Sequence, residues 1–329
     1  SNGSLLRELI KLKRKEMSEK RRERSKKTKL PRITYPKNTE FKYYREIRAL
    51  LDPIIKEATF SIRQNIANWT REFNQDSLRT DAYSEELQNI INTLNNMSDK
   101  IYGDNKDEIF LMLKGIGYDV TGHSRKQINK ILSKLVGIDI NFSDVWEQEV
   151  VNAWAQNNYN LIKSLNDEYI KKVNNIVASG VQADKTVSTI MKDILKLNKN
   201  ISTTRAKLIA VDQVGKLNGQ AAKRRQKDLD IDKYIWMTAG DERVRGNPSG
   251  SYKNAVPSHY IMNGKVCRWD NNKVYSEDNG KTWKDRTGKM PKAIPGEEIR
   301  CRCTAIPFFD DIVDEVDKGI ENNRQEGNE

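Results

Sequence analysis

Apolar residues at helical spacing dominate the first two thirds of this 329-residue chain, and they favour a fold built from long packed helices. One stripe keeps a spacing of three or four residues across Pro53, which either kinks a helix or opens a new one. A second stripe runs from Ser143 to near Gly180, and further helices are expected over 183–197 and 203–227. Glycines interrupt the pattern at positions 103, 115, 117 and 137, where we expect helices to end.

The character of the sequence changes near Asp230. Residues 233–238 alternate like a strand, and Gly, Pro, Asn and Ser become frequent after them. Further short strands are expected over 263–267, 273–275, 282–283 and 302–306. The sequence therefore predicts a mainly α N-terminal region with long helices, followed by a small α+β C-terminal module with short antiparallel strands. The expected parts are a basic arm that is flexible or conditionally helical (1–37), a helical domain (38–229), the module (230–309) and an acidic tail (310–329).

The net charge of +12 is concentrated in the basic arm. Residues 1–37 hold 14 Lys and Arg and 4 Glu, so the other 292 residues together carry only +2. Such a cluster suits a polyanion, because each neutralised phosphate releases counterions without any reading of base sequence. The arm residues expected to contact DNA in this non-specific way are Lys11, Lys13, Arg14, Lys15, Lys20, Arg21, Arg22, Arg24, Lys26, Lys27 and Lys29. The alternatives are a solvated terminus, pairing with the acidic tail of a neighbour, and a helix that docks through residues 5–12.

Four short motifs follow one another in the last hundred residues. They are Trp236-Met-Thr-Ala-Gly-Asp241-Glu-Arg243-Val-Arg245, Pro257-Ser-His259, Asn263-Gly264-Lys-Val266 and Cys301-Arg302-Cys303-Thr304. In this order and spacing they resemble the C-terminal module of the phage Mu F-like minor head proteins, also called phage head-morphogenesis proteins, over about residues 200–306. The structural signature of the resemblance is Trp236, Asp241, Arg243, Arg245, Gly264 and Arg302. We expect the charged members of this signature to form a hydrogen-bond network that braces the module.

The resemblance implies a minor capsid protein of a tailed phage rather than an enzyme. Proteins of the family act in head assembly near the portal, and some take part in DNA packaging or ejection. The implied partners are the portal protein, other capsid components and packaged double-stranded DNA. The implied location is the portal-proximal capsid interior of the virion, after synthesis in the host cytoplasm. Two other classes stay open: a toxin-related or Cys/His-dependent enzyme, and a free-standing protein that binds nucleic acid without sequence preference.

Three cysteines and one histidine fall within 45 residues, namely His259, Cys267, Cys301 and Cys303. Three thiolates and an imidazole are a usual ligand set for structural Zn²⁺, which is the cofactor that this cluster would hold. Many members of the family carry a further Cys-x-x-Cys after the Asp-x-Arg segment, where this chain has Arg243-Val-Arg245-Gly. Buried thiols beside a hydrogen-bonding histidine are the main alternative. A cysteine nucleophile, with Asp241 orienting the histidine, is the other.

Residues 276–283 read Ser-Glu-Asp-Asn-Gly-Lys-Thr-Trp and fit the Asp-box pattern S-x-D-x-G-x-T-W. One copy of this pattern predicts a hairpin turn and not a glycosidase, because its Asn-Gly pair favours a tight turn between strands. The sequence contains no Gly-rich phosphate loop, no His-Glu-x-x-His and no Gly-x-Ser-x-Gly. No apolar run approaches the ~20 residues that a membrane-spanning helix needs, so no membrane partner is expected.

Overall fold

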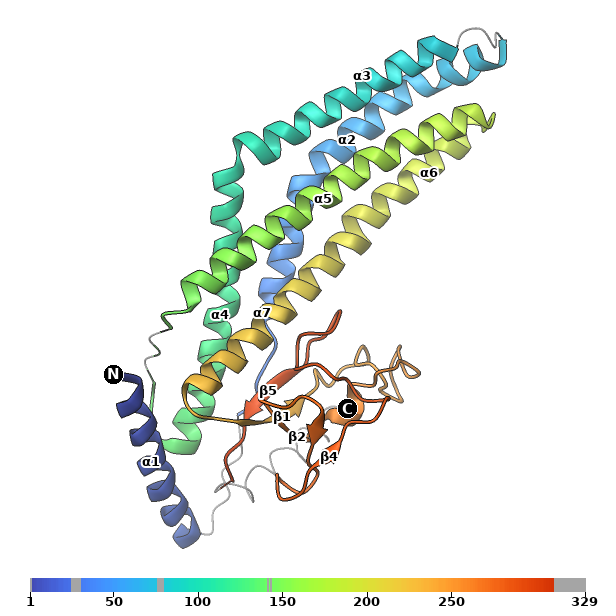
Figure 1. Ribbon diagram of the computed structural model, residues 1–329. Helices are drawn as coiled ribbons and strands as arrows, with labels where there is room; N and C mark the ends of the chain where they lie inside the picture. The colour runs from blue at the N-terminus through green and yellow to red at the C-terminus, as the bar shows by residue number, and fades with distance from the viewer. Residues whose placement is uncertain (1, 25–30, 76–79, 141, 143, 311–329) are drawn as a thin grey trace. The chain divides into compact units, whose positions relative to one another are not determined.

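The computed structural model describes residues 2–24, 31–75, 80–140, 142 and 144–310 (Figure 1). Over these ranges the α-helices are α1 (Asn2–Arg24), α2 (Lys37–Gln75), α3 (Thr80–Asp99), α4 (Lys106–Val136), α5 (Glu147–Gln182), α6 (Val187–Lys199) and α7 (Ala206–Asp228). Two π-helical segments, η2 (Lys100–Asp104) and η3 (Asn200–Arg205), precede α4 and α7. The strands are β1 (Lys233–Met237), β2 (Val266–Arg268), β3 (Val274–Tyr275), β4 (Lys284–Asp285) and β5 (Thr304–Pro307). Long helices followed by short antiparallel strands confirm the predicted fold class. The tail beyond residue 310 lies outside the described residues.

Proline and glycine interrupt the helices less than the sequence suggested. Pro53 lies inside α2, which continues on both sides of it. The expectation that helices end at Gly115 and Gly117 is wrong, because α4 runs through both positions. Apolar side chains around these glycines are fully buried, and their burial outweighs the ~1 kcal/mol that a glycine costs inside a helix. Gly137, with φ +72°, does follow the last residue of α4, as expected.

The chain forms two compact units from discontinuous segments. Unit 1 comprises Ser1–Lys37, Tyr118–Gln148 and Val211–Glu329, and unit 2 comprises Asn38–Gly117 and Glu149–Ala210. Residues 118–148 and 211–229, which their helical periodicity placed in the helical domain, therefore pack with the C-terminal module. The reason is a shared hydrophobic core, which periodicity along the chain cannot reveal.

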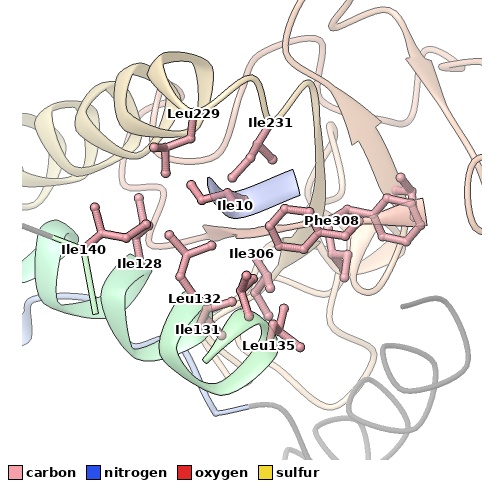
Figure 2. Close-up of a cluster of buried hydrophobic side chains, with 14 of the residues drawn as sticks. Ile10, Ile128, Ile131, Leu132, Leu135, Ile140, Leu229, Ile231, Ile306 and Phe308 are labelled. Atoms are coloured by element: carbon pink, nitrogen blue, oxygen red, sulfur yellow. The ribbon is translucent and has the colours of Figure 1, made fainter. Parts of the chain in front are cut away.

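The core of unit 1 joins residues from distant parts of the sequence (Figure 2). Ile10 of α1 is 2% exposed and lies among side chains of α4, of the segment after α7 and of the sheet. These partners include Ile131, Leu132, Ile231 and Ile306. The arm helix is thus anchored by Ile10, whereas Leu5 and Leu12 on its other side are exposed. Burying an isoleucine side chain contributes roughly 1.5–3 kcal/mol, so Ile10 favours the docking of α1 on this unit.

The main sheet has the order β2-β1-β5, with both pairs antiparallel. Because side chains alternate along a strand, β1 contributes to two cores. Ile235 and Met237 join the core that contains Ile10. Tyr234 and Trp236 join a second core on the opposite face, together with Cys267 of β2 and the cysteines near β5. This second core is where the candidate site lies.

Unit 2 is a helical assembly whose buried polar groups pair across helices. Tyr169 of α5 donates to Asn198 Oδ1 of α6 at 2.9 Å, and Asn198 Nδ2 donates to Thr59 Oγ1 of α2 at 2.8 Å. Asn166 of α5 donates to Ser98 Oγ of α3 at 2.7 Å. A shift of one helix along another would leave these groups unpaired, so the pairs fix the register of the helices.

None of the described helices combines the length and the apolar character that crossing a membrane requires.

Candidate metal centre

Three of the four predicted ligands meet in the second core of unit 1. The ligand atoms of His259, Cys301 and Cys303 all lie within 4.8 Å of one another, and all three residues are buried. Cys303 Sγ is 3.6 Å from His259 Nδ1. On the other side of the ring, His259 Nε2 is 2.8 Å from Glu298 Oε2. The histidine therefore presents Nδ1 to the sulfurs, while a carboxylate fixes the ring from behind.

Cys267 is not part of this group. It lies on β2, directly opposite Tyr234 of β1, and its thiol donates weakly to the carbonyl of Lys265 at 3.9 Å. Burial raises the pKa of its thiol above the ordinary value. The structure thus groups two cysteines and one histidine, because β2 places the third cysteine elsewhere in the same core.

The segment before Cys301 is held by a close contact with helix α7. A Cβ added to Gly215 would lie 2.5 Å from the carbonyl oxygen of Cys301, and one added to Gly219 would lie 2.1 Å from that of Pro295. Gly296 itself has φ +92° and donates its N–H to Cys301 Sγ at 3.2 Å. Sequence reasoning missed these contacts, although the Gly-x-x-x-Gly spacing of Gly215 and Gly219 is a signal for close packing on a helix face.

His259 is positioned by the turn that contains the signature arginines. Its backbone N–H donates to the carbonyl of Arg245 at 3.0 Å, and the short helix η4 (Tyr260–Met262) begins directly after it. Trp236 of β1 packs edge-on against the imidazole, with ring centroids 5.9 Å apart. The ring is thus fixed by a backbone hydrogen bond, an aromatic contact and the Glu298 carboxylate.

The electrostatics of the cluster favour a thiolate. A hydrogen bond from the Cys303 thiol, together with His259, holds the pKa of Cys301 well below its ordinary value. Burial raises the pKa of Cys303 well above its ordinary value. Burial disfavours the charged imidazole, but hydrogen bonds to Cys301 and Glu298 outweigh it and raise the pKa of His259 to about 9. Without a metal, these contacts favour the charged forms of Cys301 and His259 and the neutral form of Cys303.

The same donor set fits a zinc ion. Zinc bonds of about 2.0–2.3 Å in tetrahedral geometry require donor atoms about 3.3–3.8 Å apart, and the Cys303–His259 distance lies in this range. Zinc-bound histidines usually donate their second ring nitrogen to a carboxylate, as His259 is placed to do with Glu298. The chain supplies three ligands from one loop and one turn, which leaves a fourth position.

Two of the signature arginines form ion pairs within the module. Asp241 accepts two bonds from the Arg243 guanidinium, at 3.2 and 2.7 Å. Arg245 donates to Glu298 at 3.2 Å, so Glu298 and not Asp241 orients the histidine. Sequence reasoning missed Glu298, which no spacing rule connects with His259. Arg302 stacks over the ring of Tyr35, 5.8 Å from its centroid.

Gly264, the remaining signature residue, forms a turn between η4 and β2. Its φ is +79°, a conformation that favours glycine, and its N–H donates to the carbonyl of Trp236 at 2.8 Å. The turn delivers β2 to the edge of β1.

The Asp-box segment forms the expected hairpin, in which β3 pairs antiparallel with β4. The Asp278 carboxylate accepts from the N–H and the hydroxyl of Thr282, at 2.8 and 2.6 Å. Ser276 Oγ accepts from the N–H of Gly280 at 2.8 Å. These bonds are internal to the turn, in keeping with a structural motif.

The arm residues expected to contact DNA are described only in part. Lys11 pairs with Glu8 at 3.2 Å, Lys13 pairs with Glu16 at 2.8 Å, and Arg14 stacks over the ring of Phe309. Lys15 is exposed. The side chains of Lys20, Arg21, Arg22 and Arg24, and all of Lys26, Lys27 and Lys29, lie outside the described residues. The part nearest the core is thus partly neutralised by its own glutamates.

Comparison with known proteins agrees with the resemblance seen in the motifs. Residues 171–306 match the family model described as Phage Mu protein F like protein. An uncharacterized protein of Haemophilus influenzae strain Rd is 28% identical over 200 residues, which is 58% of this chain and 37% of that protein. The chain therefore covers little more than a third of the length of this relative. No solved structure gives a significant match. The family match contains the whole signature and the three clustered ligands.

Proposed function

We propose that this chain, which matches the Phage Mu protein F like family over residues 171–306, is a minor head protein of a tailed phage that acts in head assembly. The observation that carries the proposal is that this match runs from the second half of α5 through α6, α7 and the strands, and contains all the signature residues. Its partners would be the portal protein and other capsid components. It would be located in the portal-proximal interior of the virion.

A structural role fits the site better than a catalytic one. Cys301 and Cys303 are only 3% and 4% exposed, and the Glu298 carboxylate that fixes the histidine is itself paired with Arg245. A thiol nucleophile needs access to its substrate, whereas a buried cluster of two thiols and an imidazole suits bracing of a small module. The proposal therefore assigns no reaction to this chain.

The test is mass spectrometry of purified particles from the source of this sequence, before and after DNA release. Presence in full and emptied particles is the result expected of a fixed head component. Presence in full particles alone would identify a head protein that leaves with the DNA. Absence from both would refute the assignment to the head.

We infer further that the module holds one structural zinc ion through His259 Nδ1, Cys301 and Cys303. When bound, zinc would link the histidine turn to the β5 loop. Metal analysis of purified protein should give about one zinc per chain. Cys303→Ser should lower this ratio, while Cys267→Ser, which changes a buried cysteine outside the cluster, should not. Well-folded wild-type protein without zinc would contradict the inference even if Cys303→Ser failed to fold.

The basic arm is proposed to contact packaged DNA without sequence preference. Removing residues 1–37 is a poor test, because it would also remove Ile10 from the core of unit 1. Replacing Lys20, Arg21, Arg22 and Arg24 by glutamine keeps the anchor and removes four positive charges. The dependence of DNA affinity on salt should then become shallower by about 0.9 for each phosphate that the arm no longer neutralises. An unchanged slope would exclude these residues as the contact.

A further inference from the structure

A small hollow adjoins the candidate metal centre. It has a volume of about 30 Å³, and His259, Cys301 and Cys303 all contribute to its wall. A water molecule needs roughly 10–15 Å³ of such space. Because a zinc ion takes up no more room than a water molecule, the hollow has space for the ion and for one small ligand beside it.

The protein ligands leave one position of a zinc ion to be filled. Zinc in proteins is bound by four ligands in tetrahedral geometry. The cluster supplies three ligand atoms that lie within 4.8 Å of one another, and over the described part of the chain no further His, Cys, Asp or Glu belongs to this group. The fourth ligand must therefore come from the hollow or from a side chain that moves.

The wall of the hollow offers Asp241 as the one further residue whose side chain zinc commonly binds. Both of its carboxylate oxygens already accept hydrogen bonds from Arg243. Oδ1 accepts from the backbone N–H at 3.1 Å, and Oδ2 accepts from Nε and Nη2 at 3.2 and 2.7 Å. The arginines of the wall have no lone pair to give to a cation, because a guanidinium carries donors only.

Two other ligand side chains near the cluster are also held away from the ion. Glu298 meets the histidine ring at Nε2, at 2.8 Å, whereas the sulfur of Cys303 lies at Nδ1 on the opposite side. Cys267 is fixed by the pairing of β2 with β1, where it lies opposite Tyr234. Neither residue reaches the fourth position unless these contacts break.

We propose that the metal centre is open, with a solvent water from the hollow as its fourth ligand. Three protein ligands and a water are the arrangement of zinc sites that keep an exchangeable position. The hollow limits this position to ligands of a few atoms, so the proposal adds no reaction on a base, a sugar or a peptide. It rests on the zinc ion inferred above, which three protein ligands suffice to hold between the histidine turn and the β5 loop.

X-ray absorption spectroscopy of the zinc-loaded full chain counts the sulfur atoms around the ion. The expected shell has two sulfurs at about 2.3 Å and two lighter atoms at about 2.0–2.1 Å. Cys267→Ser is the matched variant, because it removes a buried thiol of the same core and should leave this shell unchanged. Three sulfurs in wild type, one of which is lost in Cys267→Ser, would show that Cys267 closes the site and would overturn the proposal.

Electron paramagnetic resonance of the cobalt(II)-substituted chain identifies the fourth ligand. In water enriched in a magnetic oxygen isotope, a bound solvent oxygen should broaden the cobalt signal of wild type and of Asp241→Asn alike. An unbroadened signal in wild type would overturn the open site, whether or not the variant folds. Broadening that appears only in Asp241→Asn would assign the position to the Asp241 carboxylate. If well-folded wild type bound neither metal, the zinc inference itself would fail, while the particle experiment would still test the head-protein proposal.

Discussion

Replacing Gly219 by alanine should destabilise the protein, although alanine is the better helix former. Gly219 lies on the face of α7 that contacts the backbone before Cys301. A Cβ at this position would be 2.1 Å from the carbonyl oxygen of Pro295 and 3.2 Å from its carbonyl carbon. Real Cβ contacts essentially never fall below 3.0 Å, so helix and loop must separate by almost 1 Å.

The magnitude follows from two opposing terms. Alanine in place of glycine favours a helix by about 1 kcal/mol. Overpacking of a tight contact costs about 1–3 kcal/mol, and the upper part of this range applies because the opposing atoms are backbone and no side-chain rotation can relieve the clash. We expect a net decrease of about 1–2 kcal/mol in the free energy of unfolding. The displaced loop carries Cys301, so affinity for zinc should fall as well.

Urea unfolding followed by tryptophan fluorescence measures the effect. Gly122→Ala is the matched control, because Gly122 also lies in a helix of unit 1, in α4, and an added Cβ there has nothing within 4 Å. This control should be more stable than wild type by up to about 1 kcal/mol. If Gly219→Ala proved as stable as wild type while Gly122→Ala behaved as expected, the close contact between α7 and the loop would be refuted.

Three further outcomes are expected. Arg225→Met should lower the free energy of unfolding in urea by roughly 3 kcal/mol. This is the low end of the ~3–5 kcal/mol range for a broken buried pair, because Asp144 keeps its bond to Arg125. An unchanged midpoint would show that this fully buried arginine does not contribute to stability. Thr186→Ala should lower the free energy of unfolding by about 1 kcal/mol, because it removes the N-cap hydrogen bond from the N–H of Thr189. Circular dichroism during unfolding measures this decrease. Lys265, with Lys284, lowers the pKa of Glu277 to about 2 from 4.5, so this ion pair stabilises the fold above pH 4.5 and the stabilisation disappears as the pH falls towards 2. The Tm of Glu277→Gln should therefore lie below that of wild type at pH 5 and converge with it near pH 2, and a gap that stayed constant would contradict the assignment.

The local part of this fold could be predicted from the sequence alone. Helical spacing predicted α2, α5 and α7, and alternation predicted β1, because the period of side chains along an element is a property of a few neighbouring residues. The Asp-box turn was predicted for the same reason, since its hydrogen bonds join residues four apart at most, such as Ser276 and Gly280. The order of the motifs also sufficed to identify the resemblance that the family match supports.

The tertiary structure decided which of the residues in the sequence motifs lie in contact with one another. The four predicted metal ligands share a short stretch of sequence, yet Cys267 lies on β2, outside the group formed by His259, Cys301 and Cys303. The carboxylate that orients the histidine is that of Glu298. Ile10 becomes a core residue only because α4 and the sheet close around it. Contacts between segments depend on where strands pair and where backbones approach one another, and no periodicity along the chain records those distances. The sequence thus determined the elements and the chemistry available, and the packing of α7, β1 and the β5 loop determined the site.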